Sequence, residues 1–151
     1  MENLDYHFIK KNTINNIKQG YIAPSEIHGF GLFAKVNIDK NDILCVLDGQ
    51  ILSWEKYHNI QNNVSHLIKS PYEQYIFMEW NALDEDTLLV RPFRTKYSYI
   101  NHSRSPNIKI IHYPLRIVAI SDIKLDEEII IDYREEPLNY EYIKNHGSMY
   151  L

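Results

Sequence analysis

The segment of this 151-residue chain with the most chemically capable side chains is YINHSRSPN, which runs from Tyr99 to Asn107. It places an Asn-His pair, two serines and a Pro-Asn pair directly after the strand-like stretch KYSYI. Asn, Ser and Pro are frequent turn residues, so one interpretation is a polar loop that ends a β-strand. The other is a loop whose amide and imidazole groups bind a ligand. The segment alone does not decide between the two.

A second segment, IHGFGLFA at residues 27–34, places Gly29 and Gly31 on either side of Phe30. A dinucleotide-binding fingerprint needs a third glycine and a following helix, whereas an apolar, strand-like stretch follows here. A Rossmann-type site is therefore not predicted. The glycines either form a tight turn or bulge, or they let the backbone approach another group closely.

A third segment, DEEIIIDYREEP at residues 126–137, ends an apolar run with Asp132 and Tyr133. A tyrosine at the end of a strand is most often the amphipathic edge of a core. A hydrolase built from His102 and Asp132 is disfavoured because no activated nucleophile accompanies them. The seven histidines show neither H-E-x-x-H nor paired spacing, so no metal site is predicted.

These segments lie among short apolar runs, rich in β-branched and aromatic residues, which are typical of strands in small sheets. A helix is expected over Ser53–Ile68, and turns are expected at residues 39–42 and 126–128. The fold class predicted from this pattern is mainly β with one or two short helices. The apolar runs are residues 21–25, 31–38, 42–52, 75–81, 87–93, 108–113, 116–123 and 128–133.

Composition narrows the classes of function. The chain is 44% hydrophobic, which suits one domain with a proper core, and its net charge of -4 does not favour direct nucleic-acid binding. A single cysteine, Cys45, excludes a disulfide framework and a four-thiolate zinc site. With neither a signal peptide nor a membrane span evident, we expect an intracellular, cytoplasmic protein, or one in a host nucleus if it is viral or an effector.

In order and spacing, the three segments resemble the signature motifs of the SET-domain protein lysine methyltransferases. The family patterns are G-x-G-hydrophobic-F-A, N-H-S-x-x-P-N and G-E-E-hydrophobic-x-x-D-Y, and the resemblance covers about residues 21–137. It implies a SET-domain, β-clip-like fold of several small sheets, with the N-H-S stretch threaded through a loop near the D-Y motif as a pseudoknot. Residues 1–20 would form an arm or short helix and residues 138–151 a C-terminal lid. Asp126 replaces the glycine of the third pattern, and Arg104 stands where many members carry Cys.

The resemblance implies methyl transfer from S-adenosylmethionine to a lysine amine, with S-adenosylhomocysteine as the product. Tyr133 would be catalytic, with Tyr75 as a second tyrosine unless Tyr75 is a core aromatic on a strand. Ile131 would line the substrate channel with Tyr133 and Tyr75, and it leaves open how many methyl groups are transferred. One C-terminal tyrosine would cover the adenine, unless these tyrosines seal the core or a dimer contact instead. The implied cofactor-binding residues are His28, Gly29, Phe30, Gly31, Tyr99, Ile100, Asn101, His102 and Tyr140.

The expected partner is a protein or peptide that carries an acceptor lysine and pairs along an exposed strand edge. A homodimer is left open. The alternative function is a SET-fold interaction module that has lost turnover. The joint presence of Asn101, His102 and Tyr133 favours the enzyme, because a binding module has no need for the Tyr133 hydroxyl.

Overall fold

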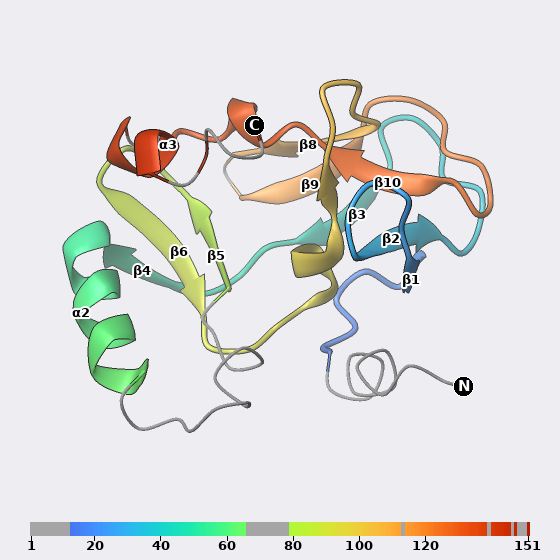
Figure 1. The fold of residues 1–151 in the computed structure, drawn as a ribbon. Helices are drawn as coiled ribbons and strands as arrows, with labels where there is room; N and C mark the ends of the chain where they lie inside the picture. The colour runs from blue at the N-terminus through green and yellow to red at the C-terminus, as the bar shows by residue number, and fades with distance from the viewer. Residues whose placement is uncertain (1–12, 66–78, 113, 139, 146, 148–150) are drawn as a thin grey trace. The chain divides into compact units, whose positions relative to one another are not determined.

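The computed structural model describes residues 13–65, 79–112, 114–138, 140–145, 147 and 151 (Figure 1). The chain divides into two compact units, which we describe separately. Unit 1 comprises Met1–Leu47 and Thr95–Tyr133, and unit 2 comprises Asp48–Arg94 and Arg134–Leu151. No helix among the described residues is both long enough and apolar enough to cross a membrane.

Unit 1 contains a seven-stranded sheet in the order β1-β2-β10-β8-β9-β3, with β7 paired to β10 beside this path. The centre of the sheet is β10, which is antiparallel to β2 and parallel to both β7 and β8. Its neighbours therefore come from two distant stretches of the sequence, β2 at residues 30–34 and β7 and β8 within residues 101–111. The strands are β1 (Gly20–Pro24), β2 (Phe30–Ala34), β3 (Ile43–Val46), β7 (Asn101–His102), β8 (Ile108–Ile111), β9 (Arg116–Ala119) and β10 (Glu128–Ile131).

The core of unit 1 is aliphatic. In β10, Ile129 and Ile131 are buried while Glu128 and Ile130 are half-buried, as expected for a strand whose side chains alternate between two faces. Full burial of each such side chain stabilises the fold by about 1.5–3 kcal/mol relative to exposure. The largest fully buried residues of this unit are Ile17, Leu32, Ile38, Ile100, Ile108, Ile117, Ile123 and Ile129.

Unit 2 contains a three-stranded antiparallel sheet in the order β4-β6-β5, with β4 (Gln50–Ser53), β5 (Glu79–Ala82) and β6 (Thr87–Arg91). The helix α2 (Trp54–Ser65) begins where the hydroxyl of Ser53 accepts the Lys56 amide at 3.1 Å, an N-cap contact. The core of this unit combines aromatic rings with aliphatic side chains, and the ring centroids of Trp54 and Trp80 lie 5.0 Å apart. The short helix α3 (Tyr140–Asn145) follows near the C-terminus.

The structure confirms the mainly β fold and places a strand in every expected apolar run that it describes. It also confirms the helix after Ser53 and both turns, where Asn41 and Asp126 adopt positive φ angles of 76° and 69°. The domain boundaries at residues 20 and 137 stay a prediction.

One element differs from expectation. The stretch KYSYI is not a strand, since Lys96–Tyr99 forms the 3₁₀ helix η2. The Thr95 hydroxyl accepts the Tyr97 amide at 3.3 Å, and the Ile100 amide donates to the Tyr97 carbonyl at 3.1 Å. Capping by Thr95 outweighs the β propensity of the tyrosines because these hydrogen bonds satisfy the backbone locally.

Candidate active site

Asn101 and His102 lie beside Tyr133 because β7 runs parallel to the end of β10. Ile130 is the register partner of Asn101, and Ile131 is that of His102. Two residues further along, Tyr133 begins the 3₁₀ helix η3 (Tyr133–Glu135). The strand pairing thus brings together two motifs that are some thirty residues apart in the sequence.

Tyr133 contacts β7 through its backbone, its ring and its hydroxyl. Its amide donates to Nδ1 of His102 at 3.1 Å, and the two rings stack with centroids 5.9 Å apart and planes at 17°. Its hydroxyl donates to the carbonyl oxygen of Ile100. The half-buried phenol is therefore fixed in orientation by three separate contacts.

The hydrogen bond from Tyr133 also sets the tautomer of His102. Because Nδ1 accepts a hydrogen bond, the proton of the neutral imidazole is on Nε2. The Asp132 carboxylate lies 3.8 Å from the same Nδ1. Nδ1 cannot accept from Tyr133 and carry a proton at once, so in the neutral imidazole this nitrogen has no proton to donate to Asp132.

Asn107 of the same segment holds this arrangement in register. The side-chain amide of Asn107 donates to the Glu128 carbonyl at 2.8 Å, and its oxygen accepts the Ile130 amide at 2.9 Å. The Asn107 amide donates to the Ile130 carbonyl at 3.1 Å. Asn107 thus extends the pairing between β10 and the segment that leads into β8.

The side chain of Asn101 is directed at the loop that follows β1. Its Nδ2 lies 2.9 Å from Oε1 of Glu128 and 3.1 Å from Oγ of Ser25. The carbonyl oxygens of His28 and Phe30 lie at 3.2 and 3.3 Å. An amide group has two hydrogens to share among these acceptors, and the charged one is the nearest.

The two glycines of the motif at residues 27–34 are needed for different structural reasons. Gly29 is exposed, and a Cβ there would meet nothing within 4 Å. Its φ of +46° is a backbone conformation that favours glycine, so the turn rather than a lack of space accounts for this residue. Gly31 is buried in β2, and a Cβ there would lie 2.3 Å from Oε1 of Glu128. Both interpretations of the motif hold, the tight turn at Gly29 and the close approach at Gly31.

The remaining candidate residues differ in their surroundings. Tyr99, Ile100 and Ile131 are buried, at 7%, 1% and 2% exposure, whereas His28 is exposed. Tyr75 lies outside the described residues. Of Tyr140 the structure describes only the backbone, at the start of α3 in unit 2.

Tyr142, another C-terminal tyrosine, packs into the aromatic core of unit 2. Its ring centroid lies 5.7 Å from that of Trp54 and 5.3 Å from that of Trp80. Leu138 packs against the same cluster. For Tyr142 this agrees with the alternative in which the C-terminal tyrosines seal the core rather than cover the adenine.

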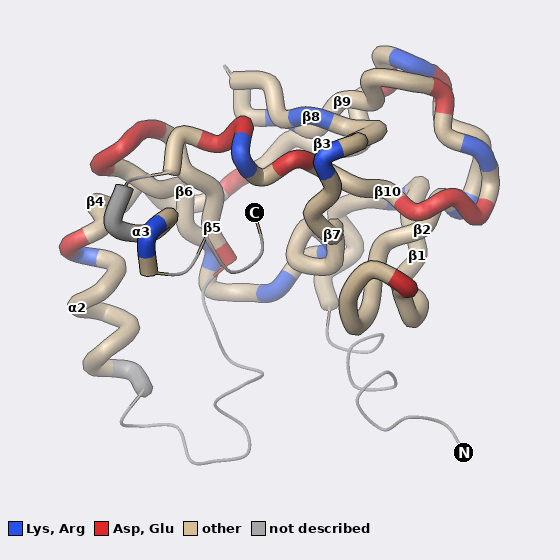
Figure 2. The backbone as a smooth tube through the Cα atoms, turned by 45° about the horizontal axis from the view of Figure 1, so that its top comes forward, with Lys and Arg blue, Asp and Glu red and all other residues tan. Residues whose placement is uncertain are grey.

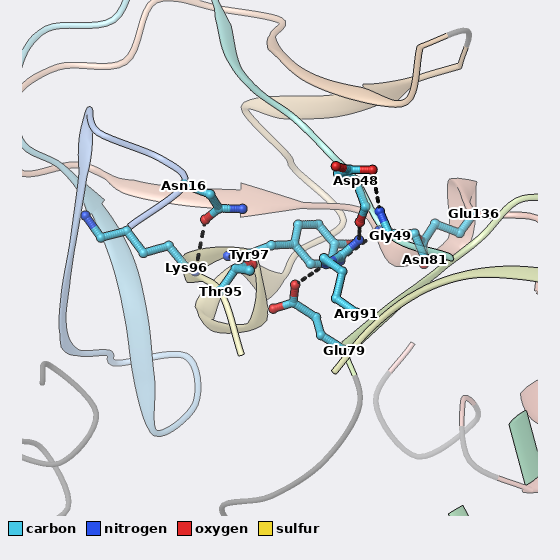
Figure 3. Close-up of polar contacts among 10 residues, drawn as sticks. All are labelled: Asn16, Asp48, Gly49, Glu79, Asn81, Arg91, Thr95, Lys96, Tyr97 and Glu136. Atoms are coloured by element: carbon cyan, nitrogen blue, oxygen red, sulfur yellow. Dashed lines mark hydrogen bonds and ion pairs between the residues drawn. The ribbon is translucent and has the colours of Figure 1, made fainter. Parts of the chain in front are cut away.

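Sequence reasoning missed two groups of polar residues. Ser25 and Glu128 meet Asn101 in unit 1, and a buried cluster around Arg91 lies in unit 2 (Figure 3). The guanidinium of Arg91 pairs with Glu79 at 2.5 Å and donates to Asn81 at 2.7 Å and to the Asp48 carbonyl at 3.0 Å. A signal was present, because Glu79 and Asn81 are alternate, hence same-face, residues of a strand otherwise rich in apolar side chains.

Glu136 joins this buried cluster to the C-terminal segment. Its carboxylate accepts from Nδ2 of Asn81 at 3.0 Å, and Asn81 is fully buried. The other acidic side chains that the structure describes in unit 2 are exposed, most densely at Asp84, Glu85 and Asp86 in the turn between β5 and β6, whose tube is red in Figure 2.

Comparison with known proteins identifies the family. The model of the SET domain matches residues 29–134, more than half of the chain. The chain belongs to the SET domain family. Its match includes all three motifs.

Two curated relatives of this SET domain carry related names. One is "Histone-lysine N-methyltransferase, H3 lysine-4 specific" of Schizosaccharomyces pombe, 33% identical over 124 residues, which are 78% of this chain and 13% of the relative. The other is "Histone-lysine N-methyltransferase trr" of Drosophila melanogaster, 30% identical over 148 residues, 91% of this chain and 5% of the relative. The chain thus spans only a small part of the length of either relative.

A solved structure resembles the fold of this SET domain. It is the crystal structure of the polycomb repressive complex 2 of Chaetomium thermophilum, with a TM-score of 0.54 and 22% identity. The match covers 76% of this chain and 15% of the solved one. At this identity, the likeness supports the SET-domain fold alone.

Proposed function

We propose that this SET domain is an S-adenosylmethionine-dependent protein lysine N-methyltransferase. The observation that carries the proposal is the convergence of His102 and Tyr133, whose rings stack while the Tyr133 amide donates to the imidazole. Relatives named histone-lysine N-methyltransferases support the same activity. A protein substrate with an acceptor lysine follows from the proposal.

The chemistry of the side chains fits a cofactor that is a cation with a purine. The faces of aromatic rings attract cations, and Tyr133 offers a half-buried ring at the end of β10. Asn101 and His102 are also half-buried, so neither is sealed into the core. We assign the adenosine end of the cofactor to β7, with Tyr99 and Ile100 beside it. We assign the amino-acid end of the cofactor to the backbone of residues 28–31.

When bound, S-adenosylmethionine supplies a sulfonium methyl group, whose C–S bond breaks as the lysine nitrogen forms an N–C bond. The main demand on the protein is alignment. Because the Tyr133 hydroxyl donates its proton to the Ile100 carbonyl, its oxygen lone pairs remain available to accept an N–H from the incoming amine. Tyr133 is thereby suited to orient the nucleophile.

The acceptor lysine must lose a proton before it reacts. Transfer from water into a tyrosine-lined channel disfavours the ammonium form, and a nearby sulfonium repels it, so both effects lower the pKa of the substrate amine. Water then takes the proton. We assign the channel to Tyr133, Ile131 and Tyr75, and the cover of the adenine to Tyr140. A homodimer and the cellular location stay predictions.

Calorimetric titration with S-adenosylhomocysteine, followed by incubation of mixed proteins with labelled S-adenosylmethionine and mass spectrometry, tests the proposal. We expect saturable binding and labelled lysines. His102→Ala should weaken binding, whereas His112→Ala, a histidine of unit 1 outside the site, should not. Binding without any labelled lysine would favour the silent interaction module, and absence of binding would contradict the proposal.

A further inference from the structure

The carboxylate of Glu128 joins three segments that are distant in the sequence. Oγ of Ser25 donates to it, at 2.8 Å from Oε1 and 3.0 Å from Oε2. Nδ2 of Asn101 lies 2.9 Å from Oε1. One side chain of β10 therefore contacts both the end of β1 and the strand β7.

This contact depends on the absence of a side chain at Gly31. A Cβ there would lie 2.3 Å from Oε1 of Glu128 and 3.0 Å from Cβ of Ser25. At 2.3 Å one of the two atoms must move, and a displaced carboxylate would lose its present geometry with Ser25 and Asn101, whereas the 3.0 Å approach to Ser25 needs only a small shift. The backbone of β2 at this point thus provides the space in which the carboxylate lies.

Ser25 also closes the loop that leads to Gly31. Its hydroxyl oxygen accepts the Ile27 amide at 3.0 Å, and its own amide donates to the Gly29 carbonyl at 2.8 Å. Residues 26–29 are exposed, so little packing orders them. The hydrogen bonds at Ser25 are consequently a main constraint on the shape of this loop.

We infer that Ser25 and Glu128 are positioning residues that order the loop at residues 26–30 against Asn101 before cofactor binding. The inference rests on the proposed function, in which the loop and β7 bind opposite ends of the same molecule. A cluster that fixes the two segments relative to each other removes an ordering cost from binding. The negative charge of the Glu128 carboxylate strengthens each hydrogen bond that this group accepts.

Glu128→Gln tests the inference, because the amide keeps the size of the side chain but loses its charge and directs hydrogens at Asn101 or Ser25. We expect the dissociation constant of S-adenosylhomocysteine to rise about tenfold and kcat to change far less. Amide hydrogen exchange at residues 26–30 should accelerate in the cofactor-free protein. Glu127→Gln is the matched control, since Glu127 is the adjacent, exposed acid and its substitution removes the same charge.

Gly31→Ala provides a second test through its coupling to Glu128. In the wild-type background the new methyl group should displace the carboxylate and accelerate exchange at residues 26–30. In a Glu128→Ala background the same change should have a much smaller effect, because the clashing oxygen is gone. Equal effects of Gly31→Ala in both backgrounds would contradict the inference.

Ser25→Ala is the variant to use if Glu128→Gln does not fold, since it removes only a hydroxyl. Unchanged exchange and unchanged affinity in Ser25→Ala, or equal changes in Glu128→Gln and the Glu127→Gln control, would overturn the positioning role. If the wild-type protein does not bind S-adenosylhomocysteine, the proposed function fails instead. The exchange measurements still decide the role of the cluster in that case.

Discussion

At the scale of single residues, Arg91 is a buried cation that contacts Glu79, Asn81 and the Asp48 carbonyl. Its side chain and that of Glu79 are 9% and 3% exposed, and the two are register partners across β5 and β6. The attraction within a buried ion pair is offset by the large free-energy cost of removing both charges from water. Removal of one partner leaves the other charge buried without compensation, so it destabilises the fold more than removal of both.

Glu79→Leu should therefore destabilise the protein by about 3–5 kcal/mol, because it leaves the Arg91 charge buried beside an apolar group. The double variant Glu79→Leu/Arg91→Met should lose less than Glu79→Leu alone. Urea unfolding measures both, with Glu85→Gln as an exposed acidic control in the same unit. Additive losses in the double variant would contradict this account of the pair.

The backbone conformation at Asp126 limits which residues can replace it. At φ +69° a Cβ is strained, although aspartate tolerates this region better than most residues. Its carboxylate also accepts the hydroxyl of Tyr21 at 2.8 Å. This is the position at which the family pattern has glycine.

Asp126→Ala should be less stable than Asp126→Gly by about 1 kcal/mol, because both variants lose the carboxylate but only alanine keeps the strain. Thermal unfolding of the two variants gives the difference directly. Tyr21→Phe removes only the hydroxyl that donates to Asp126, so it measures how much this hydrogen bond contributes to the stability of the folded protein. Equal stability of the alanine and glycine variants would show that the turn is not strained.

At the scale of elements, the strands could be predicted because short β-branched runs between turn residues are a local signal. The helix η2 could not, since it depends on the Thr95 cap and on a bridge between Thr95 and Ile14, which is about eighty residues away. The contacts of Ser25 with Glu128 were hidden for the same reason, because a serine at a strand end predicts only a turn. Local propensity does not report long-range partners.

The hairpin of β5 and β6 should carry a pH-dependent contribution from Asp84. Its pKa is lowered by a hydrogen bond from the Thr87 side chain, then by the Asp86 and Thr87 amides. A depressed pKa in the folded state adds stability above the unfolded pKa, and that stability is lost as the pH falls through the folded value.

Asp84→Asn keeps an oxygen acceptor but cannot titrate. Between pH values of about 6 and about 3, wild type should therefore lose more stability than Asp84→Asn, as measured by urea midpoints at each pH. The exposed neighbour Glu85→Gln should follow wild type. Parallel losses in wild type and Asp84→Asn would contradict the role of this turn.

At the scale of the whole molecule, three motifs spread over about a hundred residues predicted one site, and the sheet of unit 1 accounts for the meeting of the second motif with Tyr133 of the third. The parallel pairing of β7 with β10 could be inferred only through the family resemblance, because parallel strands leave no local turn signal. The part of the site assigned to Tyr75 lies outside the described residues, and its role stays a prediction.

In the proposed mechanism, the Tyr133 hydroxyl orients the reacting amine beside a cofactor bound by β7. Tyr133→Phe should keep the affinity for S-adenosylhomocysteine within about threefold and lower the rate of lysine methylation by about a hundredfold or more. Tyr21→Phe, which removes a hydroxyl elsewhere in unit 1, should change neither. A Tyr133→Phe protein that methylates lysine at the wild-type rate would contradict the account.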